Sequence, residues 1–301
     1  MTIGRADKME RKLRLKMLPV RHLHSQLQAA ANIWREIEHQ PHPADRWLGN
    51  YFHRWRKKFG SRDRRFLSET IYALFRHKTY LETWAQSLGP PEDPRVLVLL
   101  AAVLENLVSR KDFEDELSER QSRVKNGASL YQALKEGVLP SSVHPRSLEE
   151  KMSLEFSFPL WLVKRWTNRY GLQEATGLIR SLQERPPLVI RTNPLRIQRE
   201  DLIRKFRRKN FKVTATSKSP FGIVFKDRVN LFDSKEFREG LFEIQDEGSQ
   251  LVCQRIDPQP GEVIWDVCAG GGGKSLLMAA LMKNKGRIIA TDIRPQKLGE
   301  L

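Results

Sequence analysis

The chain has 301 residues, 40% of them hydrophobic, and a formal net charge of +17 from 53 Lys and Arg against 36 Asp and Glu. Single cores usually stop growing near about 250–300 residues, so we expect several domains, and the basic excess favours a nucleic acid as partner. The chain has two cysteines, too few for a disulfide framework or a cysteine-rich metal site, so we expect no metal partner. No apolar stretch approaches the about 20 residues that span a bilayer, so we expect a cytoplasmic protein without a membrane partner.

Residues 1–110 show the apolar periodicity of a helical bundle. An amphipathic helix is predicted over 24–40, and the stretch Asp63–Leu81 places apolar residues at helical spacing before a stop at Gly89 and two prolines. A second apolar helix is predicted over Arg95–Val108. The stretch Asp63–Leu81 resembles a helix of the NusB-like RNA-binding domain, so an all-α NusB-like N-terminal bundle is the expectation for residues 1–110.

Cations interleave with aromatic residues between these helices. Such a patch neutralises phosphates, and Trp55 would stack on a base if its ring is exposed. A solvated helix face with buried aromatic rings explains the same pattern equally well. The RNA contacts expected from this region are Arg56, Lys57, Lys58 and Arg64.

Residues 111–150 are polar and charged, with glycines and prolines that are typical of a linker carrying short helices. Residues 151–236 then predict a small α+β region. Its expected helices are Pro159–Tyr170, Leu172–Leu182 and Glu200–Lys209, and its expected strands lie in PLVIRTNPLRI, which turns at Asn193-Pro194, in KVTAT and in FGIVF. We expect Trp161 and Trp166 to pack in a core.

The same α+β region carries a dense set of cations. A run such as RKFRRK is usually a solvated helix face, but its proximity in sequence to a ligand-binding pattern favours an RNA contact. The residues predicted to contact RNA here are Arg191, Arg196, Arg207 and Arg208.

The last stretch reads strand, glycine-rich turn, helix, strand and acid. Strands are predicted over Val263–Val267 and Arg287–Thr291, with four glycines and a helix over Lys274–Lys283 between them and Asp292 after them. Glycines let the backbone approach a ligand, and the first helical turn offers free N–H donors to an anionic group. A carboxylate at the tip of the next strand accepts hydrogen bonds from a ribose.

Three ligand classes share this plan. A P-loop ends in Gly-Lys-Ser, as Gly273-Lys274-Ser275 does, but Cys268 stands where its first glycine must be, which weakens that reading without excluding it. A dinucleotide-binding turn fits the four glycines only partly. S-adenosylmethionine fits best. The predicted cofactor-binding residues are Cys268, Ala269, Gly270, Gly271, Gly272, Gly273, Lys274 and Asp292.

DVCAGGGGKS followed by IIATDI resembles the first two cofactor motifs of the RsmB/Nop/Sun family of RNA 5-methylcytosine methyltransferases. Gly270 and Gly271 replace the Ala-Pro that is usual there. The stretches Phe237–Val252, Ser157–Gly171 and Pro187–Ile197 resemble the segments that precede the motif in that family. The resemblance implies the start of an α/β Rossmann-like S-adenosylmethionine-dependent methyltransferase domain over 237–301, after the α+β region that helps to hold the RNA.

In that family a cysteine thiolate adds to C6 of the cytosine, and a second cysteine beside a proline assists release. The chain contains neither a Pro-Cys nor a Thr-Cys-Ser sequence, so no catalytic residue is assigned and the nucleophile is expected beyond Leu301. The leading hypothesis is therefore an RNA cytosine-C5 methyltransferase acting on ribosomal RNA, of which this chain is the N-terminal portion. The alternative is a non-catalytic RNA-binding module with a vestigial cofactor loop, and a nucleotide triphosphatase is third.

Overall fold

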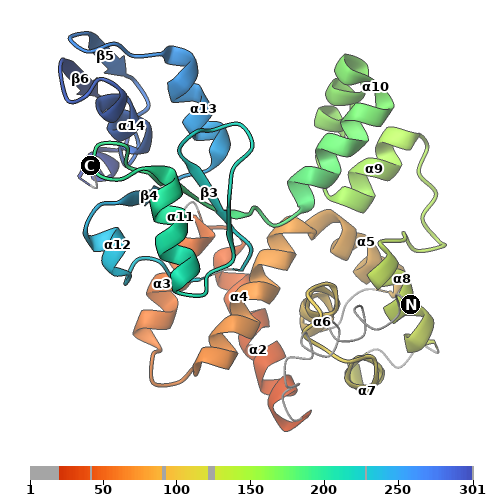
Figure 1. Ribbon diagram of the computed structural model, residues 1–301. Helices are drawn as coiled ribbons and strands as arrows, with labels where there is room; N and C mark the ends of the chain where they lie inside the picture. The colour runs from red at the N-terminus through yellow and green to blue at the C-terminus, as the bar shows by residue number, and fades with distance from the viewer. Residues whose placement is uncertain (1–19, 41–42, 90–92, 121–125, 228, 300–301) are drawn as a thin grey trace, which may run out of the picture. The chain divides into compact units, whose positions relative to one another are not determined.

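A computed structural model describes residues 20–40, 43–89, 93–120, 126–227 and 229–299. The chain forms two compact units, which comprise residues 1–184 and 185–301. Within the described residues the first unit is helical, and the strands belong to the second unit (Figure 1). Helices therefore dominate, with small sheets in the second unit, as predicted. The NusB-like relationship of the bundle stays a prediction.

Helix α6, Arg95–Leu104, lies at the centre of the first unit's core. Its sequence is apolar almost all round, and the side chains from Val98 to Val103 are buried, as expected for a helix with neighbours on all sides. It packs against α2, α4, α5, α7 and α8. The first helices of the unit are α2 Val20–Ile37, α3 Ala44–Arg54, α4 Ser61–Arg76 and α5 Lys78–Ser87.

The predicted linker contributes to this core. Helices α7, Arg110–Arg120, and α8, Gly127–Glu136, bury Phe113, Leu117 and Leu134 in the same cluster as α6. A pair of apolar residues four positions apart lies on one face of a helix, so a mostly charged segment can still pack. The short helices agree with the sequence prediction, but the first core extends through residue 134 instead of ending near 110.

Helices α9, Leu148–Phe156, and α10, Leu160–Gln183, pack side by side (Figure 1). Gly171 has φ +77° and interrupts α10 between the two helices that the sequence predicts. Trp166 packs against Phe158, but Trp161 is 65% exposed, so the expected core role for both tryptophans is wrong for Trp161. Five residues turn a helix by about 140° beyond one full turn, so the two rings point in different directions.

The second unit contains a four-stranded antiparallel sheet in the order β2-β3-β1-β4. Its strands are β1 Leu188–Thr192, β2 Val213–Ala215, β3 Gly222–Phe225 and β4 Phe242–Ile244. Helix α11, Arg199–Arg208, covers one face with Leu202, Ile203 and Phe206. This α+β arrangement follows the prediction, including the turn at Asn193, whose side-chain Oδ1 accepts the backbone N–H of Leu195 at 3.1 Å.

A second, two-stranded parallel sheet joins β5, Val263–Asp266, to β6, Arg287–Ala290, through α14, Gly273–Leu281 (Figure 1). Helix α13, Glu247–Ile256, packs against α14, and Asp246 caps it by accepting the N–H of Ser249 at 2.8 Å. The short helices α12, Lys235–Arg238, and α15, Pro295–Leu298, complete the unit. Across the described residues, no helix combines the length and apolarity that crossing a bilayer requires.

Candidate functional site

The glycine turn and the acid after β6 lie together. The backbone N–H of Gly270 donates to Oδ2 of Asp292 at 2.9 Å, and the N–H of Ala269 donates to the carbonyl of Thr291 at 3.0 Å. Gly270 and Gly272 have φ of +57° and +81°, in the left-handed region that favours glycine. Two of the glycines are therefore needed for the backbone path itself, which brings the turn to the acid.

Asp292 keeps capacity for a ligand. Its Oδ1 accepts the N–H of Arg294 at 2.9 Å, which leaves about two of the four lone-pair sites of the carboxylate. The hydrogen bonds from the N–H groups of Arg294 and Gly270 lower the pKa of Asp292 below its ordinary value. Asp292 is therefore an ionised acceptor at neutral pH.

The helix after the turn supplies donors. Gly272 is its N-cap, so the N–H groups of its first turn, from Gly273 onward, have no partner within the helix. Ser275 is buried and its hydroxyl donates to Oδ2 of Asp266 at 2.7 Å. A P-loop needs that hydroxyl for a metal ion, so this hydrogen bond counts against the triphosphatase hypothesis and leaves the backbone N–H groups as the candidate donors to an anion.

Arg191 lies in the interior, which corrects its prediction as an RNA contact. Its side chain is 4% exposed, and Nη1 donates to Oε1 of Gln245 at 2.9 Å and to the carbonyl of Gly273 at 2.5 Å. Burial lowers the pKa of the guanidinium. The strand alternation of β1 turns Arg191 toward α13 and α14, away from α11. The sequence did not predict this buried position, because the acceptor is the backbone carbonyl of Gly273, 82 residues further along the chain.

The two cysteines differ in environment. Cys253 is buried in the cluster of Leu277 and Met278, and burial raises the pKa of its thiol. Cys268 is exposed in the glycine turn. Burial disfavours the thiolate of Cys253, so it is a packing residue; the position of Cys268 makes it a residue of the turn.

The basic patch predicted in the first unit is exposed. Trp55, in the connection between α3 and α4, is 42% exposed, and the cations of Arg54 and Lys58 lie 5.7 and 5.6 Å from its ring centroid. The neighbouring aromatic residue Phe59 is buried. Of the predicted contacts, Arg56, Lys57 and Lys58 are exposed and Arg64 is half-buried. The ring therefore has the exposure that stacking on a base requires.

In the second unit the other predicted RNA residues are exposed. Arg196 donates to the carbonyl of Glu239 at 2.9 Å, and Arg207 donates to the carbonyl of Val213 at 3.2 Å. Arg208 lies on the exposed side of α11. These residues share one sign of charge, but they do not lie on one strand or one helical face. The sequence run RKFRRK suggests a single continuous patch, but these residues do not form one.

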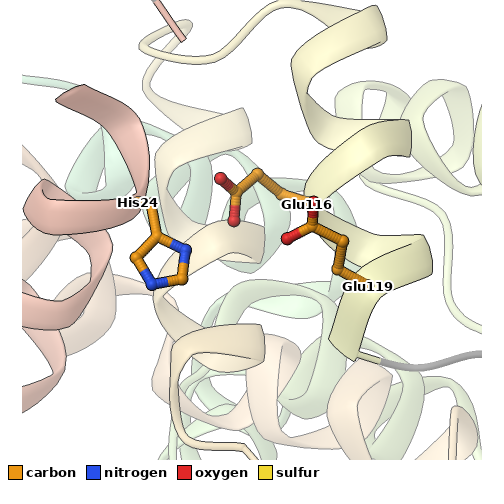
Figure 2. A group of neighbouring side chains, drawn as sticks. All are labelled: His24, Glu116 and Glu119. Atoms are coloured by element: carbon orange, nitrogen blue, oxygen red, sulfur yellow. The ribbon is translucent and has the colours of Figure 1, made fainter. Parts of the chain in front are cut away.

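One cluster in the first unit has the residue types of a metal site. Figure 2 shows the ring of His24 on α2 facing the carboxylates of Glu116 and Glu119 on α7, with ligand atoms within 4.8 Å of one another. Both ring nitrogens of His24 already contact guanidinium groups, at 3.1 Å from Nη1 of Arg95 and 2.9 Å from Nη2 of Arg120. A bound cation would meet these two positive charges, so the cluster is an ion-pair network.

Two protein-family models match parts of this chain. Residues 158–231 match the ferredoxin-like domain of RsmF/B-like methyltransferases, and residues 253–301 match the 16S rRNA methyltransferase RsmB/F family. The second match contains the glycine turn and Asp292.

Two relatives, each a probable ribosomal RNA small subunit methyltransferase B, are similar over most of this chain. The one from Synechocystis is 29% identical over 79% of this chain, and the one from Bacillus subtilis is 28% identical over 80%. In both comparisons the aligned region is 57% of the relative's length. The crystal structure of PH0851 matches 94% of this chain and 66% of its own with a TM-score of 0.63 at 23% identity, which shows a shared fold.

Proposed function

Because the chain belongs to the RsmB/Nop/Sun family, we propose that it carries the cofactor-binding turn and RNA-holding regions of an S-adenosylmethionine-dependent methyltransferase for cytosine C5 in ribosomal RNA. The observation that carries the cofactor assignment is the 2.9 Å hydrogen bond between the N–H of Gly270 and Asp292. It supports the assignment because it brings the turn before α14 next to the acid that we propose to bind the ribose. The whole protein's activity and its ribosomal substrate are part of this proposal, since the aligned region is 57% of the length of each of these two relatives.

The chain's own groups fit the polar parts of S-adenosylmethionine. The N–H donors of the first turn of α14 suit its carboxylate, because a helix N-terminus attracts negative charge. The free lone pairs of Asp292 suit the two ribose hydroxyls. When bound, the cofactor supplies an electrophilic methyl group. Arg191 holds the carbonyl of Gly273 and so fixes the start of α14.

The RNA-holding role belongs to exposed cations outside this turn. In the first unit it rests on the exposed ring of Trp55 with Arg56, Lys57 and Lys58 beside it. In the second unit it rests on Arg196, Arg207 and Arg208. Lys and Arg neutralise phosphates without reading sequence, while an aromatic ring stacks on an unpaired base. Neither Cys253 nor Cys268 is proposed as the nucleophile.

A calorimetric titration with S-adenosylmethionine tests the cofactor assignment. Asp292→Ala removes charge-assisted hydrogen bonds to the ribose, each worth about 1.5–3 kcal/mol, so the affinity falls at least about tenfold. Asp292→Asn keeps an oxygen that accepts the N–H of Gly270, and it gives an intermediate loss. Asp257→Asn is the matched control, because this exposed acid in the same unit has φ +51°, which asparagine tolerates.

The outcomes separate the candidate functions. Unchanged affinity in Asp292→Ala contradicts the cofactor assignment. Salt-sensitive RNA binding by a wild-type chain with no affinity for S-adenosylmethionine instead favours a non-catalytic RNA-binding module.

A further inference from the structure

The outer face of the β2–β3 hairpin is hollowed beside the free edge of the four-stranded sheet. A hollow of about 460 Å³ is lined by Arg207, Phe211, Lys212, Val213, Thr214, Val224 and Lys226. We call it the hairpin pocket. Strand β2 is at the edge of the sheet, so one side of the pocket opens away from the strands. None of the seven lining residues is acidic.

Two lysines stand directly opposite each other in this pocket. The pairing of Val213 with Phe225 and of Thr214 with Val224 continues to Lys212 and Lys226, and the N–H of Lys226 donates to the carbonyl of Lys212 at 2.9 Å. Directly opposite side chains point to the same face, and like charges there destabilise the strand pair. Within the described part of the chain neither lysine makes an ion pair. A bound anion would offset their repulsion.

Other side chains of the lining are fixed in place by their contacts. Phe211 packs edge-on against Phe206 and Phe225, with ring centroids 5.8 and 5.9 Å apart, and stays half-buried. Val224 and Thr214 pair across the strands on the same face as the two lysines. The guanidinium of Arg207 is held at the edge by the carbonyl of Val213. The pocket thus joins a held apolar wall to three cations.

We propose, on the basis of the RNA-directed function above, that the hairpin pocket binds one nucleotide of single-stranded RNA. Its phosphate lies between Lys212 and Lys226, within reach of Arg207, and its base lies against the ring of Phe211 at the sheet edge. Only an unpaired nucleotide presents its base face to such a wall, because bases in a duplex are stacked and paired. The pocket adds a base contact to what would otherwise be general phosphate attraction.

Fluorescence anisotropy of a labelled single-stranded oligouridylate, titrated with the full chain at several KCl concentrations, tests the pocket. The double variant Lys212→Gln/Lys226→Gln binds at least about tenfold more weakly, and its salt dependence falls by about 0.7 in log–log slope, since one single-strand phosphate contact contributes about 0.7. Phe211→Leu keeps an apolar side chain but removes the ring face, and it lowers affinity about fivefold or more.

Lys218→Gln is the matched control, because Lys218 is exposed between the same two strands and lies outside the pocket. It changes affinity less than about twofold, whereas removing two contacting cations does more. The double variant melts at the wild-type temperature or above it, because the opposed charges are gone. This readout separates lost binding from lost folding.

Four results overturn the pocket. Unchanged affinity and slope in the double variant, while the wild type binds RNA and S-adenosylmethionine, would reject the pocket and leave the proposed function standing. An equal loss of affinity for a duplex RNA would assign the lysines to general phosphate attraction. Displacement of the RNA by inorganic phosphate at matched ionic strength would reveal a simple anion site. A wild type that binds neither RNA nor S-adenosylmethionine rejects the proposed function as well.

Discussion

The two sheets of the second unit are held in different ways. In the four-stranded sheet, Ile190, Ile223 and Phe242 are fully buried under α11. In the two-stranded sheet, alternate residues face outward, and Val263 and Trp265 are 68% and 66% exposed. Burial of apolar area is the main driving force for folding, so the first sheet is stabilised by its core. Among the described residues, the second sheet packs on the smaller cluster of Cys253, Leu277 and Met278, with Ile264 and Ile288 partly buried against it.

Polar contacts and glycines therefore fix the glycine turn. The hydroxyl of Ser275 donates to Asp266, and the N–H of Gly270 donates to Asp292. Arg191 donates to the carbonyl of Gly273 and is the contact that reaches the turn from the four-stranded sheet. Changes at these contacts should alter ligand binding more than stability, and changes in the α11 core should do the reverse. Four predictions test this contrast.

The largest effect is expected in the core of the four-stranded sheet. Phe206→Ala removes a fully buried ring that contacts Phe225 and Phe242, and it should lower the free energy of unfolding by about 3–5 kcal/mol. Ile289→Ala in β6, where the side chain is exposed, should cost less than about 1 kcal/mol. Urea unfolding measures both. Equal losses would break the contrast between the sheets.

A backbone change should disrupt the two-stranded sheet next. Gly286, just before β6, has φ +124°, and an added Cβ would lie 2.4 Å from the carbonyl oxygen of Glu262. Gly286→Ala should therefore cost about 2–3 kcal/mol and abolish cofactor binding, because β5 and β6 can no longer pair as they do. Gly177→Ala in α10 is the control: its Cβ meets open space, so the helix should gain about 0.5–1 kcal/mol. Unchanged unfolding free energy and cofactor affinity in Gly286→Ala would contradict the expected disruption of the β5–β6 pairing.

Loss of the guanidinium of Arg191 should affect both properties. Arg191→Met leaves the Gly273 carbonyl and Gln245 without that donor, at a cost of about 1–3 kcal/mol for an unsatisfied buried group. Affinity for S-adenosylmethionine should fall about tenfold as the start of α14 loosens, while RNA binding stays near wild type. Arg255→Met, an exposed arginine on α13 of the same unit with no proposed RNA contact, is the control. Calorimetry and anisotropy on both variants check this, and an RNA defect in Arg191→Met alone would restore the original RNA-contact prediction.

The smallest expected effect is a difference in the alkylation rates of the two cysteines, which leaves stability unchanged. Cys268 is exposed, whereas Cys253 is buried, and burial also raises the pKa of its thiol, so both access and ionisation disfavour reaction at Cys253. Iodoacetamide should alkylate Cys268 first, and S-adenosylmethionine should slow that reaction because the turn is covered. Mass spectrometry of the peptides follows the two sites. Faster alkylation of Cys253 would contradict its burial.

Much of the fold could be predicted from local signals. Glycine, proline and apolar spacing located the strand–turn–helix–strand order from Val263 to Asp292 and the break in α10 at Gly171. The helices of the supposed linker were predicted, but their burial was not, because two apolar residues per helix suffice to join a core that other helices supply. Whether a side chain is buried depends on the helices that pack against it, and these lie outside the stretch of sequence being considered.

The site shows the same division. Proximity of Gly270 to Asp292 follows from strand order, since a parallel pair brings its carboxyl ends to one edge. The role of Arg191 does not follow, because its acceptor is a carbonyl that every residue possesses. Net charge predicts that an anion binds, but not which cations are free to bind it. The Lys212–Lys226 pair becomes visible only once the strand register is known.

Hydrogen–deuterium exchange of the full chain with and without saturating S-adenosylmethionine tests the central claim most directly. The account predicts slower exchange at the backbone amides from Gly270 to Ser275, and no change in the α11 core around Phe206. Unchanged exchange at the glycine turn, or protection confined to other segments, would contradict the assignment of this turn as the cofactor site.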